Sequence, residues 1–171
     1  MLDRIERILV ACNRWLLIVL LLAMACIVFA NVVLRYTTGD SIVWGEEVAR
    51  HMMIWVTFLG AGLVLRFGGH VAIDNLHRSV GTRTAQILRA VVAVGLGIFF
   101  IVMTVASSQY VYATRFQTTA ATDISISYIY SAMPVGFALM FFHLLYIVRG
   151  YITAGDYAES AEMDADAAAS I

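Results

Sequence analysis

Four long stretches of this chain contain no Asp, Glu, Lys or Arg, and they limit its possible folds more than any other feature. They span residues 15–34, 51–65, 90–114 and 124–148. An α-helix needs about 20 apolar residues to cross the hydrocarbon core of a bilayer, and the first, third and fourth stretches are long enough. The second reaches that length if residues 42–50 form an amphipathic helix that enters from the membrane interface. We therefore predict an all-α membrane protein with four transmembrane helices.

The composition excludes several classes of soluble protein. Of the 171 residues, 61% are hydrophobic and 13% are charged, whereas a soluble domain has about 25% charged residues. The formal net charge of −1 provides no basic surface for nucleic acid, so no nucleic-acid partner is expected. The sequence has no HExxH, P-loop, dinucleotide-binding or Ser–His–Asp signature. We predict that the protein is not an enzyme, with no catalytic residues, no metal and no cofactor.

The arginines indicate which side of the membrane each loop occupies. Eight lie in the N-terminal segment, in the loop between the second and third spans, or after the fourth span, against three on the opposite side. By the positive-inside rule, both termini are predicted to be cytoplasmic. Residues 73–80 carry apolar residues at helical spacing and predict a short amphipathic cytoplasmic segment. Residues 151–171 form an acidic cytoplasmic tail that we expect to be mobile.

Charged residues gather at the start of the second span. Ser41 is a candidate N-cap, and Glu46 and Glu47 fall near the positive end of the predicted helix. Arg50 follows Glu46 by four residues and Glu47 by three, a spacing that favours salt bridges on one helical face. In the fourth span, Pro134 removes one backbone hydrogen bond and therefore predicts a kink.

Two functional classes can be tested against the sequence: a membrane anchor of a respiratory complex, linked to quinone or haem, and an autonomous small exporter. A haem held by two histidines would require both axial ligands at one depth. His51 and His143 instead differ in depth by roughly 13 Å at about 1.5 Å per residue. An autonomous small exporter would need an ionisable group near mid-span, but no span has Asp or Glu there. The hydroxyls of Thr57 and Thr104 are expected to bond their own helix backbone.

A series of short motifs with a specific order and spacing runs along the chain. It comprises Asn31-Val-Val-Leu34-Arg35-Tyr36, Trp44-Gly-Glu-Glu47-Val-Ala-Arg50, Phe58-Leu-Gly60-Ala61, Arg66 followed by His70-Val-Ala-Ile-Asp74, and Met133-Pro134-Val-Gly136. The series resembles the small membrane subunit (DctQ type) of TRAP transporters, the tripartite ATP-independent periplasmic systems, over residues 5–150. The resemblance implies a four-helix DctQ-like domain at residues 1–150, located in the bacterial inner membrane.

The resemblance also implies an accessory function. In that family, the small subunit binds a large membrane subunit (DctM type) that carries the sodium and substrate sites and moves as an elevator. A periplasmic binding protein (DctP type) delivers the substrate, an organic acid anion such as a dicarboxylate or sialic acid. The small subunit would brace the large one, with membrane lipids as further partners.

Nine residues are candidates for contacts with the large subunit or with lipid headgroups. The charged ones would form one polar cluster on each side of the membrane and fix the helix ends there. Ion pairs within the chain are the alternative explanation for both clusters. The candidates are Arg35, Glu47 and Arg50 on the periplasmic side, Arg66, His70 and Asp74 on the cytoplasmic side, and the uncharged or small residues Trp44, Gly60 and Pro134.

Overall fold

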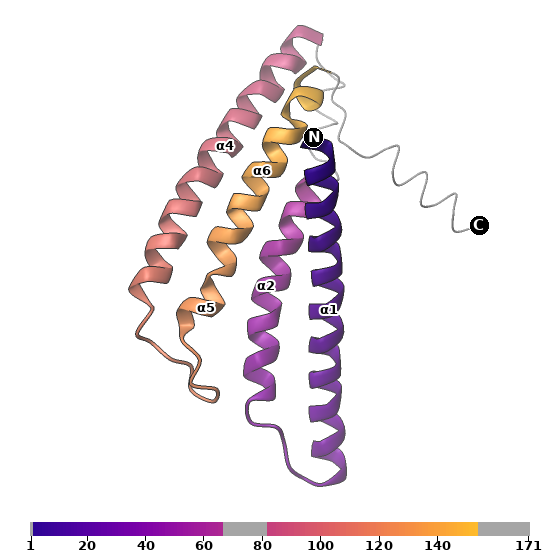
Figure 1. Ribbon diagram of the computed structural model, residues 1–171, viewed down its shortest axis with the longest axis vertical. Coiled ribbons are helices and arrows are strands. Elements are labelled where there is room, and N and C mark those ends of the chain that lie inside the picture. Colours follow the sequence, from indigo (N-terminus) through magenta and orange to yellow (C-terminus); the bar gives the residue numbers. More distant parts are fainter. Residues whose placement is uncertain (1, 67–81, 154–171) are drawn as a thin grey trace, which may run out of the picture. The chain divides into compact units, whose positions relative to one another are not determined.

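The computed structural model describes residues 2–66 and 82–153, and every element in them is helical (Figure 1). The predicted segment at residues 73–80 lies outside the described residues, as do His70, Asp74 and residues 154–171 of the predicted tail. Four helical segments are long and apolar enough to cross a membrane, which confirms the predicted spans. In chain order the helices are α1 (Leu2–Thr37), α2 (Gly45–Arg66), α4 (Thr82–Ala113), α5 (Ile126–Tyr130) and α6 (Ala132–Thr153).

The helices extend beyond the uncharged stretches that predicted them, because charged residues are tolerated at helix ends. The candidate spans are Ile8–Thr37, Gly45–Leu65, Arg83–Ala113 and Ile126–Thr153. The predicted start of the second helix, after a cap at Ser41, is wrong by three residues. The chain instead makes a turn in which the Gly45 N–H donates to the Ile42 carbonyl at 3.0 Å, and α2 begins at Gly45.

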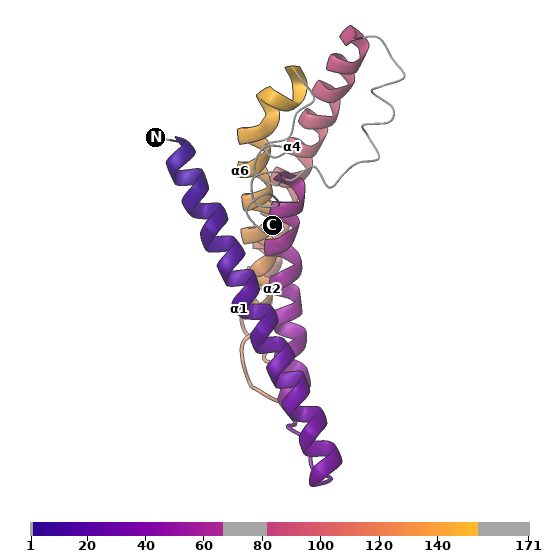
Figure 2. The same cartoon turned by 90° about the vertical axis from the view of Figure 1, so that its right-hand side faces the viewer.

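The chain divides into two compact units, each with its own packing. Among the described residues, unit 1 comprises residues 2–60 and 105–136, and unit 2 comprises residues 61–66, 82–104 and 137–153. In unit 1, α1 and the first part of α2 run side by side in opposite directions (Figures 1 and 2). Partly or fully buried residues recur along α1 at alternating spacings of three and four, the seam expected of paired helices: Val10, Asn13, Leu17, Leu20, Met24, Ile27 and Asn31.

The fourth span is interrupted near its start, as Pro134 predicted. The short helix α5 ends at Tyr130, Ser131 separates it from the next helix, and α6 begins at Ala132. Proline has no N–H to donate to the carbonyl four residues earlier, and its ring crowds that carbonyl. That carbonyl belongs to Tyr130, so the break lies where the proline places it.

In unit 2, α6 packs against both the end of α2 and the first part of α4. Gly62 of α2 lies against α6, where a Cβ on this glycine would be 3.5 Å from the His143 ring. On α4, a Cβ at Gly97 would be 3.8 Å from both Leu144 and Phe141. Two of the small residues in the spans therefore serve close helix packing within the chain.

Candidate functional site

Glu47, in the first turn of α2, is bound by the loop that joins α4 to α5. Its side chain is only 8% exposed. One carboxylate oxygen accepts a hydrogen bond from the Ala121 N–H at 2.9 Å. The other accepts from the Thr122 N–H at 3.1 Å and from the Thr122 hydroxyl at 2.6 Å. Hydrogen bonds to an ionised acceptor are the stronger class, so this set, which we name the Glu47 clasp, fixes the loop to α2 within unit 1.

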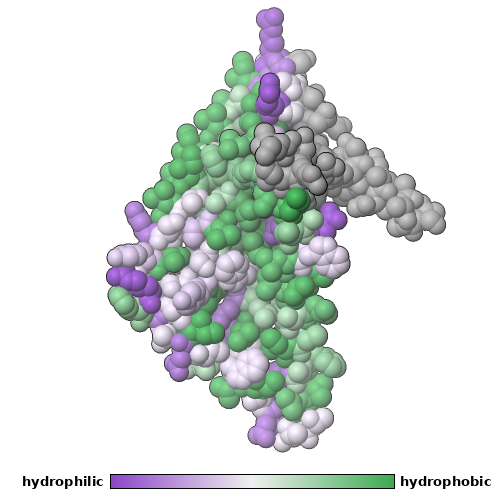
Figure 3. Space-filling view, in the orientation of Figure 1, coloured by the Kyte–Doolittle hydropathy of each residue, from purple (hydrophilic) through white to green (hydrophobic). Residues whose placement is uncertain are grey.

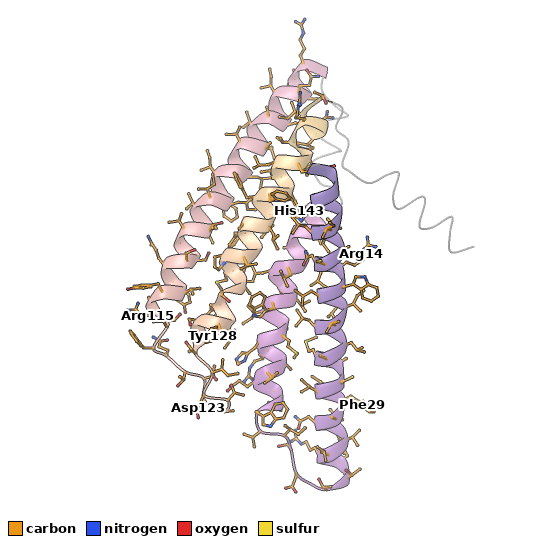
Figure 4. The ribbon with its side chains drawn as sticks, in the orientation of Figure 1. Arg14, Phe29, Arg115, Asp123, Tyr128 and His143 are labelled. Carbon is orange, nitrogen blue, oxygen red and sulfur yellow. The ribbon has the colours of Figure 1, made fainter. Side chains whose placement is uncertain are left out.

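The loop is shaped so that its N–H groups reach the carboxylate. Thr119 and Thr122 are joined through their hydroxyls at 2.7 Å, and the Thr119 N–H donates to the Ile124 carbonyl at 3.0 Å. Because the single Thr122 hydroxyl proton goes to Glu47, Thr119 is the donor in the hydroxyl pair. Asp123, at the turn labelled in Figure 4, has a φ of 53°, a left-handed conformation that Asp tolerates better than most residues.

The predicted ion pair of Glu47 with Arg50 is wrong. Within residues 2–66 and 82–153, neither Arg50 nor Arg35 forms an ion pair with Glu47, and both arginines are exposed. Spacing along one helix indicated Arg50 as the partner. The actual donors lie 74 and 75 positions later in the chain and occupy both carboxylate oxygens.

Two asparagines, one near each end of the α1–α2 seam, form polar contacts that the sequence analysis missed. Asn13 is buried and donates its side-chain N–H to the Leu59 carbonyl at 2.9 Å. Asn31 accepts the Ile42 N–H through its side-chain oxygen at 2.7 Å, which closes the connection between the helices. The available signal was their position, since both fall on the buried side of a helix that is otherwise apolar.

The remaining predicted contact residues within the described part of the chain lie outside the Glu47 clasp. Trp44 is 48% exposed beside the start of α2, and a Cβ on Gly60 would meet nothing within 4 Å. Gly136, two residues after Pro134, lies directly on α2, because a Cβ there would be 2.8 Å from the Phe58 carbonyl oxygen. Arg66 is the last residue of α2.

Polar groups inside the spans are engaged locally. The Thr57 hydroxyl donates to the Met53 carbonyl at 2.8 Å, and the Thr104 hydroxyl donates to the Phe100 carbonyl at 2.7 Å, which confirms the predicted backbone bonds. His143, labelled in Figure 4, is 1% exposed and packs on Gly62. In the part of the chain that the structure describes, no three His, Cys, Asp or Glu side chains are grouped so that they could hold a metal ion.

Comparison with known proteins identifies the family. The family model described as "Tripartite ATP-independent periplasmic transporters, DctQ component" matches residues 24–153. The C4-dicarboxylate TRAP transporter small permease protein DctQ of Rhodobacter capsulatus is 27% identical over 71% of this chain and 55% of its own length. The ectoine TRAP transporter small permease protein TeaB of Halomonas elongata is 29% identical over 79% of this chain and 71% of its own length.

A third relative is a much longer protein. The sialic acid TRAP transporter permease protein SiaT of Haemophilus influenzae is 28% identical over 78% of this chain, and the match covers 22% of SiaT. The chain thus spans about half the length of the Rhodobacter relative and about a fifth of SiaT. Since the family model covers most of the sequence, this chain belongs to the DctQ family, the small permease components of TRAP transporters.

Proposed function

We propose that this chain is the accessory subunit that braces a large, sodium-coupled elevator subunit of a TRAP transporter. In this proposal both termini are cytoplasmic, and the turn at residues 38–44 and the loop at residues 114–125 face the periplasm. A periplasmic binding protein would deliver an organic acid anion to the membrane pair. The family match supports the transport role, and the arginine distribution supports the orientation.

The observation that carries the bracing role is the exposed apolar surface of α1. Its most apolar segment has no buried residue among those described, and Phe29 is 70% exposed on its outer side (Figure 4). Hydrophobic side chains also cover the lower part of α1 in Figure 3. A helix that leaves most of its apolar surface uncovered can pack against a second membrane subunit as well as against lipid.

The relatives support the partner and the substrate class. SiaT contains a segment like this chain within a longer permease protein, which is the arrangement expected if the two parts of the transporter associate physically. The Rhodobacter relative is named for C4-dicarboxylates and SiaT for sialic acid, both organic acids. TeaB is named for ectoine, so the substrate class proposed here rests on the first two relatives.

We further propose that residues at the surface of the helices form the contacts with the large subunit or with lipid headgroups. Gly60, whose Cβ position is open, and exposed Trp44 and Arg50 are suited to such contacts. In the same proposal, Arg35 lies on the periplasmic side, Arg66, His70 and Asp74 form a cytoplasmic cluster, and Pro134 shapes the helix behind the contact surface.

Co-purification tests the proposal. The tagged chain is co-expressed with the proposed large TRAP subunit, and we expect the pair to co-purify in mild detergent. Gly60→Leu should weaken the pair if the α2 face is the contact, whereas Gly95→Leu, at another open glycine, is the matched control. A chain that purifies alone and shows a haem signal in its reduced-minus-oxidised spectrum would support the respiratory-anchor alternative and contradict this function.

A further inference from the structure

A small cavity lies at the end of the α1–α2 pair, within unit 1. Its volume is about 130 Å³, and its lining comes from the last turns of α1 and the first turn of α2: Val28, Asn31, Val32, Arg35, Gly45 and Glu46. The α1 span ends at Thr37 and the α2 span begins at Gly45, so the cavity is at the level where phospholipid headgroups meet the hydrocarbon core. Tyr36 and Trp44, the exposed aromatics beside the lining residues, are typical of this level.

The lining combines one cation and one anion with an apolar wall. The side chains of Arg35 and Glu46 are exposed, and within residues 2–66 and 82–153 neither forms an ion pair or a hydrogen bond. The Asn31 oxygen is bound by the Ile42 N–H, while its amide nitrogen donates to no acceptor in the described part of the chain. Val28 and Val32 extend the lining along α1 toward the middle of the span.

We propose that this cavity binds the headgroup of a zwitterionic phospholipid that carries phosphoethanolamine. The Arg35 guanidinium pairs with the phosphate, the Glu46 carboxylate accepts hydrogen bonds from the primary ammonium, and Val28 and Val32 contact the start of the acyl chains. The cavity holds about ten times the volume that a single water needs, which suits a headgroup of about eight non-hydrogen atoms.

Charge and hydrogen bonding together distinguish this headgroup from two other common ones. The phosphate of phosphatidylglycerol can bind Arg35, but its uncharged glycerol offers no cation to Glu46. The quaternary ammonium of phosphatidylcholine has no N–H to donate to the Glu46 carboxylate. Of these three lipids, only phosphatidylethanolamine supplies both a phosphate for Arg35 and an N–H donor for Glu46. This inference is independent of the proposed role in transport.

Native mass spectrometry of the purified full chain tests the site with three probes: phosphatidylethanolamine, phosphatidylglycerol and phosphatidylcholine of the same chain length. We expect the wild-type protein to bind phosphatidylethanolamine about tenfold more tightly than the other two. Arg35→Gln should weaken phosphatidylethanolamine binding about tenfold. Glu46→Gln should remove the preference over phosphatidylglycerol. Arg115→Gln is the matched control, because Arg115 is an exposed arginine outside the cavity.

Three results would overturn the proposal. One is equal phosphatidylethanolamine binding by the wild type, Arg35→Gln and Glu46→Gln, with circular dichroism showing that all three are folded. Another is equal binding of phosphatidylglycerol and phosphatidylethanolamine by the wild type, which would indicate an anion site only. The last is competition by chain-free glycerophosphoethanolamine at the same concentration as the lipid, which would indicate a soluble ligand in place of a membrane lipid.

Discussion

The Thr122 hydroxyl donates a 2.6 Å hydrogen bond to the carboxylate of Glu47, although 75 positions separate the two residues. This contact joins the first turn of α2 to the loop between α4 and α5. The Ala121 and Thr122 N–H groups add two further donors. A mostly buried carboxylate with three donors makes the loop part of unit 1, so changes at Glu47 should affect the loop as well as α2.

Glu47→Gln should lower the melting temperature of the purified protein by a few degrees Celsius. The glutamine keeps one oxygen acceptor but turns an NH₂ donor toward a backbone N–H, so a buried donor loses its partner and the charge-assisted bonds are lost. Asp40→Asn is the matched control, because Asp40 is an exposed carboxylate outside the cavity whose side chain accepts no hydrogen bond among the described residues.

A double-mutant cycle with Thr122→Val measures the Glu47–Thr122 contact itself. The combined loss should be smaller than the sum of the two single losses, because both variants break the same hydrogen bond. Strictly additive losses, or equal melting temperatures for Glu47→Gln and Asp40→Asn, would contradict the clasp.

Gly136→Ala should destabilise the protein by about 1–3 kcal/mol, the usual cost of overpacking. The added methyl group would lie 2.7 Å from the Phe58 Cβ and 2.8 Å from the Phe58 carbonyl oxygen, so α6 or α2 must shift. Gly95→Ala is the control, since a Cβ there meets nothing within 4 Å. That variant should be neutral or slightly stabilising, because alanine favours the helix. Equal thermal stability of the two variants in detergent would show that α6 does not pack on α2 in this way.

Asn13→Ala should cost about 0.6 kcal/mol, the average for hydrogen bonds between membrane helices. The substitution removes the bond to the Leu59 carbonyl, which already has its own helix partner, so no backbone group loses its only partner. Unfolding in denaturing detergent measures the difference, and Cys12→Ala, at the exposed preceding position, is the control. A loss well above 2 kcal/mol would indicate that Asn13 has a further partner.

Cysteine labelling tests the proposed orientation. In a protein with Cys12 and Cys26 replaced by serine, Asp40→Cys should react with a membrane-impermeant maleimide added to intact spheroplasts. Thr153→Cys, at the end of α6, should react only after the membrane is opened. The opposite labelling pattern would place both termini in the periplasm.

The four spans could be predicted because crossing a bilayer requires long segments without charged residues, and such segments can be read directly from the sequence. The helix ends could not be placed as well. Arg83 and Glu47 lie within helices, because a charged residue at a helix end can reach water or a partner. The break at Ser131 was predictable from Pro134, since a missing N–H acts on a residue at a known distance along the chain.

The site was less predictable because its contacts join distant parts of the sequence. Spacing along α2 identified Glu47 as important but indicated the wrong partner, Arg50, since only folding brings Thr122 to it. Asn13 was overlooked because an asparagine in an apolar helix becomes informative only when the facing Leu59 carbonyl is known.

Reconstitution in vesicles tests most directly whether this chain assists a large transporter subunit and does not transport a substrate by itself. The ligand is chosen as a compound that stabilises the proposed periplasmic binding protein, and the sodium-driven uptake of this ligand is measured in four preparations. These contain the chain alone, the large subunit alone, both membrane subunits, or no membrane protein, each with the binding protein outside. We predict uptake only when both subunits are present. Uptake by the chain alone, or equal uptake with and without it, would contradict the account.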